Sequence, residues 1–120
     1  MAHILLVEDN AAMQTLLREM LEWGGHHVAL GRTGEEALQV LEQSPQLPEL
    51  IVSDLNMPRM DGLELLETVR HNPQWSDVRF IMMTANRFDD RITAETSQHL
   101  VGVLPKPFGL EDLASLLSQS

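Results

Sequence analysis

The chain alternates between short apolar runs and longer segments in which apolar residues recur at helical spacing. Five short runs predict β-strands, at residues 4–7, 27–30, 50–54, 78–83 and 100–104. The longer segments that follow them predict five α-helices, centred on Met13–Leu21 and Ala37–Leu41 and covering 61–70, 87–98 and 109–117. The pattern over 87–98 is the weakest of these, because apart from Phe88, Ile92 and Ala94 that segment is polar.

Strands that alternate with helices predict an α/β fold, in which crossover helices join parallel strands and cover both faces of a doubly wound sheet. The strand segments are almost continuously apolar, which is typical of a sheet buried on both faces. In such folds ligands bind at the carboxyl ends of the strands, near a switch in strand order. The residues that directly follow each strand are therefore the first candidates for a functional site.

Length, cysteine content and net charge exclude several classes of protein. The chain has 120 residues, no cysteine, and 18 acidic residues against 8 Lys and Arg, a formal net charge of −10. The length predicts one domain over residues 1–120, and the absence of cysteine excludes disulfides and thiolate zinc sites. The negative charge argues against nucleic acid or an anionic membrane as a direct partner. Since no apolar stretch approaches the ~18 residues of a membrane span and no signal-peptide pattern is present, we expect a cytoplasmic protein.

Polar residues that could take part in catalysis or ligand binding stand at the ends of four of the five predicted strands. Glu8 and Asp9 follow the first, Asp54 ends the third, Thr84 follows the fourth and Lys106 follows the fifth. Parallel strands would bring these side chains to one edge of the sheet. Neighbouring carboxylates repel one another and need a cation, and their hard oxygen atoms suit Mg²⁺, with Mn²⁺ as the alternative.

Lys106 makes this prediction more specific, because it is the only lysine in the chain and lies between two prolines. A lysine ammonium group binds phosphate as a point charge, and the hydroxyl of Thr84 can donate to a phosphate oxygen. Carboxylates, a divalent cation, a lysine and a hydroxyl together suit phosphoryl transfer onto a carboxylate, which yields an aspartyl phosphate.

At these positions the sequence resembles the receiver domain of two-component response regulators, the CheY-like family, over essentially its whole length. The motifs that carry the resemblance are Glu8-Asp9, Ser53-Asp54-Leu55-Asn56-Met57-Pro58 with Met60-Asp61-Gly62, Met83-Thr84-Ala85 and Lys106-Pro107-Phe108. Each is weak alone, but their order and spacing together are specific. The resemblance implies a flavodoxin-like (βα)5 fold, with five helices around a parallel sheet of strand order 2-1-3-4-5.

The resemblance also implies a role for the acids. Asp54 looks like the phosphoacceptor, which attacks a phosphohistidine of a sensor histidine kinase or a histidine phosphotransfer protein. Asp9 looks like a direct Mg²⁺ ligand together with Asp54, while Glu8 would bind the ion mainly through water. The backbone carbonyl of Asn56 would be a further ligand.

The remaining family positions imply contacts to the phosphoryl group. Lys106 and Thr84 would hold its oxygen atoms, helped by the backbone N–H groups of Asn56 and Ala85. Gly62 looks like the glycine that lets the loop after the acceptor turn.

One position departs from the family pattern. An aromatic residue usually stands three positions before the lysine and swings inward when the threonine moves, but here that position is Val103 and the chain has no tyrosine. Phosphorylation should survive this change. The aromatic-coupled switch, and the readout surface that depends on it, are what Val103 calls into question.

We therefore expect a signalling domain that modifies only itself and turns over no separate substrate, with a downstream protein or a fused effector as its target. A homodimer through the face of residues 87–117 is a further expectation. One alternative is a pseudo-receiver that acts as a constitutive docking module. Another is a phosphatase with an aspartyl phosphate intermediate, but Asn56 stands where such enzymes often carry a second, proton-donating aspartate. The acids Asp89-Asp90 are interpreted as solvated surface.

Overall fold

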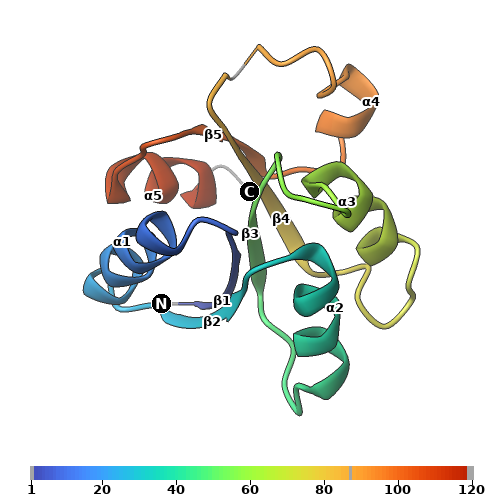
Figure 1. Cartoon of the computed structure of the whole chain (residues 1–120), viewed down its shortest axis with the longest axis horizontal. Coiled ribbons are helices and arrows are strands. Elements are labelled where there is room, and N and C mark those ends of the chain that lie inside the picture. Colours follow the sequence, from blue (N-terminus) through green and yellow to red (C-terminus); the bar gives the residue numbers. More distant parts are fainter. Residues whose placement is uncertain (1, 87, 119–120) are drawn as a thin grey trace.

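The predicted strands form one parallel sheet in the computed structural model, which describes residues 2–86 and 88–118. The strands are β1 (His3–Val7), β2 (His27–Gly31), β3 (Leu50–Asp54), β4 (Arg79–Thr84) and β5 (Gly102–Pro105). Their order in the sheet is β2-β1-β3-β4-β5 (Figure 1). This order confirms the flavodoxin-like fold that the sequence predicted, and it places the switch in strand order between β1 and β3.

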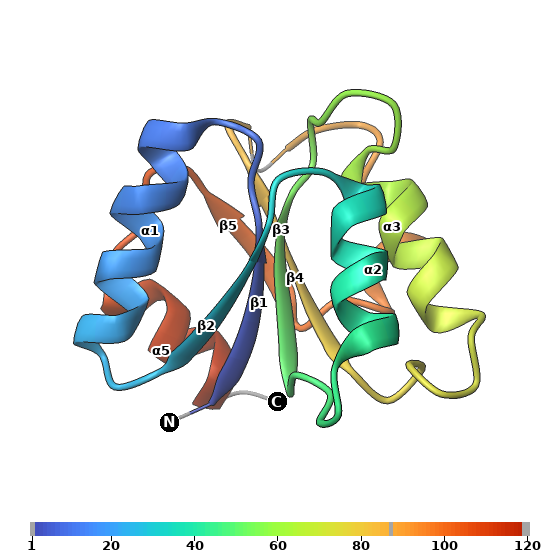
Figure 2. The same cartoon turned by 60° about the horizontal axis from the view of Figure 1, so that its bottom comes forward.

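Helices cover both faces of the sheet. They are α1 (Ala11–Trp23), α2 (Gly34–Gln43), α3 (Gly62–Arg70), α4 (Ala94–Ser97) and α5 (Leu110–Ser118). Figure 2 shows α1 and α5 against one face, with α2 and α3 against the other. No helix among the described residues is long and apolar enough to span a membrane.

The sheet separates two apolar clusters, because successive side chains of a strand point to opposite faces. In β1, Ile4 and Leu6 belong to the cluster shared with Leu17 of α1 and Leu113 of α5. Leu5 belongs to the other cluster, which contains the buried residues of α2 and α3. Both clusters are closed to solvent, which explains why the strand segments are apolar throughout.

The helix starts follow local chemistry. Asn10 is the N-cap of α1, since its side chain accepts a hydrogen bond from the backbone N–H of Met13 at 2.9 Å. Helix α3 begins at a capping box, in which Asp61 and Glu64 each accept a hydrogen bond from the other's backbone N–H. This cap fixes where the chain enters α3, directly behind the loop that follows Asp54.

The predicted helix over 87–98 is wrong in its extent. Only Ala94–Ser97 is helical and none of its residues is buried, while residue 87 lies outside the described residues. Asn86 accepts from the N–H of Phe88 and Asp89 from the N–H of Arg91, each at 3.0 Å. Short polar side chains that bond the backbone in this way compete with helix formation. Without a buried apolar face, nothing offsets that competition.

Candidate acidic site at the carboxyl end of the sheet

Glu8, Asp9 and Asp54 come together where β1 and β3 end. The two strands are neighbours and pair Val7 with Ser53, so the residues that follow lie side by side. One carboxylate oxygen from each acid lies within 4.8 Å of the others. Among the residues that the structure describes, no other group of three or more His, Cys, Asp or Glu side chains could hold a metal ion. The predicted acidic cluster therefore exists in the fold.

Burial distinguishes the three acids. Glu8 is 1% exposed and Asp54 5% exposed, whereas Asp9 lies open to solvent. Both oxygen atoms of Glu8 already have partners, since one accepts from Lys106 at 3.0 Å and the other from the backbone N–H of Asn10 at 3.1 Å. Of the neighbouring acids Glu8 and Asp9, it is thus Asp9 that presents its carboxylate to solvent.

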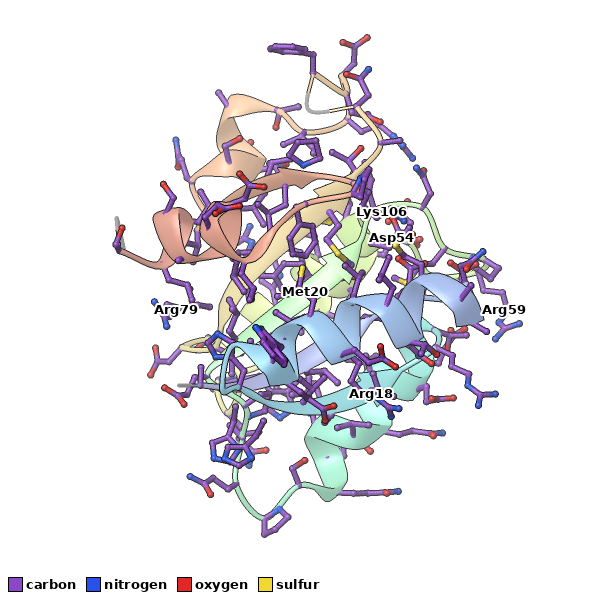
Figure 3. The ribbon with its side chains drawn as sticks, turned by 90° about the vertical axis from the view of Figure 1, so that its left-hand side faces the viewer. Arg18, Met20, Asp54, Arg59, Arg79 and Lys106 are labelled. Atoms are coloured by element: carbon purple, nitrogen blue, oxygen red, sulfur yellow. The ribbon has the colours of Figure 1, made fainter. Side chains whose placement is uncertain are left out.

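Lys106 reaches this cluster from the end of β5, across the end of β4. Its Nζ donates to Glu8 Oε1 and to Asp54 Oδ2, both at 3.0 Å. Figure 3 shows the Lys106 and Asp54 side chains close together at this edge of the sheet. The backbone N–H of Lys106 donates to the carbonyl of Thr84 at 2.8 Å, and the Lys106–Pro107 peptide bond is cis. The predicted juxtaposition of acids and lysine is present.

The net charge of the site is negative, although Lys106 is part of it. Burial raises the pKa of Glu8, the nearby charge of Asp54 raises it further, and hydrogen bonds from the Asn10 N–H and Lys106 only partly offset this rise. Burial opposes the charge of Lys106, but its hydrogen bonds with Asp54 and Glu8 prevail and raise its pKa. Three carboxylates and one ammonium leave a formal charge of −2. This donor set of carboxylate oxygens fits a hard divalent cation such as Mg²⁺.

Thr84 is buried beside this cluster at the end of β4, but its hydroxyl faces its own loop. It donates to the carbonyl of Asn86 and accepts from the N–H of Asn86, both at 3.1 Å. The neighbouring Ala85 is exposed. A role for the Thr84 hydroxyl at a phosphoryl group would therefore require it to exchange these partners within its own loop.

Asn56 connects the acidic cluster to a contact that sequence reasoning missed. Its backbone N–H donates to Asp54 Oδ1 at 3.3 Å, while its side-chain oxygen accepts from Arg91 Nη2 at 2.8 Å. Arg91 also forms an ion pair with Asp89 at 2.8 Å. The interpretation of Asp89 as merely solvated surface is therefore wrong. The one available signal was the Asp-x-Arg spacing of residues 89–91, in the loop that follows the fourth strand.

The model of the family described as response regulator receiver domain matches residues 4–118. The chain belongs to the response regulator receiver family. It is 32% identical to a probable chemotaxis protein CheY of Rhizobium etli over 95% of this chain and 88% of that protein. It is 34% identical to response regulator MprA of Mycolicibacterium vanbaalenii over 92% of this chain, which spans only 46% of that longer protein.

Solved structures of receiver domains are also similar to this chain over nearly its whole length. The receiver domain of the sensor histidine kinase PA1611 from Pseudomonas aeruginosa, described with a magnesium ion coordinated in its active-site cleft, is 32% identical with a TM-score of 0.84. That match covers 98% of this chain and 95% of the solved one. Chemotaxis protein CheY4 of Vibrio cholerae is 29% identical with a TM-score of 0.81, over 99% of this chain and 98% of the other.

The receiver glycine Gly62 serves a purpose that differs from the one expected. A Cβ at this position would lie 2.5 Å from the carbonyl oxygen of Asp54 and 2.6 Å from Met82 Sδ. Its N–H donates to the carbonyl of Leu55 at 2.9 Å. Close packing of the start of α3 against the end of β3 thus requires a glycine here, beyond any demand of the turn.

Val103, the departure from the receiver pattern, lies in β5 opposite Met82 of β4. It is half-buried and lines a groove together with Pro105 and Leu116. Val103 thus belongs to β5 and is not one of the residues of the acidic cluster.

Proposed function

We propose that this receiver domain accepts a phosphoryl group on Asp54 from the phosphohistidine of a sensor histidine kinase or a histidine phosphotransfer protein. The observation that carries the proposal is the position of Lys106 Nζ, 3.0 Å from both Glu8 and Asp54. Removing such charges from water is costly. Clusters that pay this cost in a cleft are frequently functional, because their charges are needed for chemistry.

In the proposed transfer, a carboxylate oxygen of Asp54 attacks phosphorus while the bond from phosphorus to the donor's imidazole nitrogen breaks. The donor histidine recovers its lone pair, and Asp54 becomes an acyl phosphate. Lys106 holds the acceptor carboxylate before the reaction, and afterwards its ammonium group stabilises the added negative charge. The hydroxyl of Thr84 exchanges its Asn86 partners for a phosphoryl oxygen, which alters the loop after β4.

Asp9, Asp54 and the backbone carbonyl of Asn56 would hold Mg²⁺, with Glu8 binding through water. When bound, the ion supplies positive charge at the phosphoryl oxygens. The structure supports this division of labour in that both Glu8 oxygens already accept hydrogen bonds, while Asp9 is exposed. The magnesium ion described in the similar Pseudomonas aeruginosa domain supports the assignment as well. Mn²⁺, with the same preference for oxygen ligands, should replace it.

In this proposal the protein is a signalling domain that turns over no substrate other than its own acyl phosphate. Its output is a changed binding surface for a downstream protein or a fused effector in the cytoplasm, without direct contact to nucleic acid or membrane. Homodimerisation through the face of residues 87–117, the first of which lies outside the described residues, stays a prediction.

Acetyl phosphate with Mg²⁺ tests the chemistry. We expect intact-protein mass spectrometry to show a gain of one phosphoryl group, which Asp54→Asn abolishes and chelation of the metal prevents. Asp77→Asn, which removes an exposed acid outside the cluster, is the matched control and should be labelled like the unmodified protein. No labelling under conditions that label another receiver domain would contradict the proposal.

The pseudo-receiver alternative rests on Val103. Backbone amide NMR spectra with and without beryllofluoride, an acyl phosphate mimic, distinguish this alternative from the phosphorylation-dependent switch. We expect chemical-shift changes that extend from Thr84 through the loop after β4. Labelling of Asp54 with shifts confined to the acidic cluster would instead indicate chemistry without a switch, and a docking role that does not depend on phosphorylation.

A further inference from the structure

We propose that Arg91 is a positioning residue that prolongs the lifetime of the Asp54 phosphoryl group by holding the Asn56 side chain at the mouth of the acidic site. The inference rests on the proposed function of Asp54. It assigns a task to a side chain that none of the receiver motifs contains.

The Arg91 guanidinium is held in place by hydrogen bonds from both the side chain and the backbone of Arg91 to the Asp89 carboxylate. Its Nε donates to Asp89 Oδ1 at 3.0 Å and its Nη2 to Asp89 Oδ2 at 2.8 Å, a two-point pairing that orients the planar group. The backbone N–H of Arg91 donates to the same Asp89 carboxylate at 3.0 Å. Hydrogen bonds from Arg91 lower the pKa of Asp89 to about 2 and those to Asp89 raise the pKa of Arg91. The pair therefore stays charged at physiological pH.

The fixed guanidinium then binds a residue that touches the acceptor. Arg91 Nη2 donates to Asn56 Oδ1 at 2.8 Å across 35 positions of sequence. The N–H of Asn56 donates to Asp54 Oδ1 at 3.3 Å. The contact thus connects the loop after β4 to the loop after β3 beside the carboxylate that would carry the phosphoryl group. Asn56 and Arg91 are both exposed, so they lie on the side from which solvent water arrives.

Loss of the phosphoryl group is a hydrolysis. The oxygen of a water molecule attacks phosphorus, the bond from phosphorus to the Asp54 oxygen breaks, and the Asp54 carboxylate and inorganic phosphate result, with the proton of water passing to phosphate or solvent. The Asn56 side chain, held next to the backbone N–H that contacts Asp54, restricts the approach of that water. Releasing it should speed hydrolysis without removing any group that contacts phosphorus.

The test measures the rate at which the labelled protein loses phosphate. We expect Arg91→Ala to shorten the lifetime about threefold, the range of one exposed charged contact. Arg91→Lys should behave similarly, because a lysine cannot pair with Asp89 and Asn56 in the same planar arrangement. The matched control is Arg70→Ala, which removes an arginine paired with Glu67 at 3.0 Å on α3 and should leave the lifetime unchanged.

A double-mutant cycle identifies the route of the effect. If Arg91 acts through Asn56, Arg91→Ala has no further effect in an Asn56→Ala background. Independent, multiplying effects of the two substitutions would overturn the inference, as would a lifetime that Arg91→Ala does not change. Rescue by Arg91→Lys would point to charge alone and overturn the positioning role.

A second measurement needs no phosphorylation. In the unlabelled protein, the Asn56 side-chain amide signals, assigned through Asn56→Ala, should shift on Arg91→Ala and not on Arg70→Ala. An unshifted signal overturns the contact itself. If the unmodified protein cannot be labelled at all, the proposed function fails and the claim about lifetime fails with it. Labelling with an unchanged lifetime defeats this inference alone.

Discussion

The chain leaves β3 and β4 at the same edge of the sheet, yet different forces hold the segments that follow. After β3, helix α3 buries Leu65, Leu66 and Val69 and begins with a reciprocal capping box. After β4, helix α4 has four residues, none of them buried. The loop ahead of α4 is instead held by hydrogen bonds of the Thr84 and Asn86 side chains to nearby backbone N–H groups and by the Arg91 contacts.

This difference separates a fixed side of the site from an adjustable one. Burial of apolar surface holds α3 against β3, and with it the position of Asp54. Polar contacts of the loop after β4 exchange for contacts with water or phosphate at little net cost. Thr84 lies at the start of that adjustable segment, so a new partner for its hydroxyl can reorganise the loop without disturbing the core.

The largest expected difference concerns apolar burial. Leu65→Ala, which removes a fully buried side chain of α3, should lower the free energy of unfolding by about 3 kcal/mol. Ile92→Ala, which shortens a half-buried side chain ahead of α4, should cost about 1 kcal/mol. Urea denaturation measures both. Equal losses would show that the segment after β4 is packed as firmly as α3.

Gly62 tests how tightly α3 is held against β3. Gly62→Ala should destabilise the fold by about 2 kcal/mol, because the new methyl group would collide with the backbone at Asp54. Gly109→Ala is the control, since its Cβ would meet only the ends of the Glu111 and Asp112 side chains, at 3.2 and 3.8 Å. It should change stability by at most about 0.5 kcal/mol. A neutral Gly62→Ala in thermal unfolding would show that α3 can shift.

The two N-caps offer a matched pair of smaller effects. Asp61→Ala removes the cap of α3 and should cost about 1 kcal/mol. Thr93, whose side chain accepts from the N–H of Thr96, caps α4. Thr93→Ala should cost less than about 0.5 kcal/mol, because a helix without buried residues adds little to global stability. Chemical denaturation of both variants provides the comparison, and the reverse order would contradict it.

The smallest effect is a dependence on pH. The pKa of Asp89 lies at about 2, below its ordinary value of 3.8, chiefly because of its hydrogen bonds with Arg91. Since the folded pKa is the lower one, the stabilisation is complete above pH 3.8 and is lost as the pH falls through 2. Carboxyl NMR titration should show this value, and Arg91→Ala should raise it towards the ordinary one. An unchanged titration would show that Asp89 has another partner.

The two segments also differ in how well their sequence predicts them. Apolar spacing predicts a helix over 61–70, and the structure has α3 at Gly62–Arg70, because the residues that form the helix also bury it. The segment over 87–98 has apolar residues but no continuous face. The side chains of Asn86, just before it, and of Asp89 bond the nearby backbone instead. Its short helix therefore depends on what the rest of the molecule leaves for it to pack against.

The acidic site shows the same division. The residue types that follow each strand predict which side chains meet, because parallel strands end at one edge of a sheet. Their spacing does not reveal that Glu8 is buried while Asp9 is exposed. It also gives no sign that Arg91 binds Asn56, since that contact depends on where two loops lie in space.

By itself, then, the sequence determined the strands, the strand-end acids and Lys106, because side-chain periodicity and strand-end chemistry are local properties. Only the tertiary structure decided the partners. Lys106 meets Glu8 across 98 positions of sequence, and Gly62 is needed because β3 passes within contact distance of it. Such contacts arise from the order of the strands and the packing of the helices, which no single segment of the chain specifies.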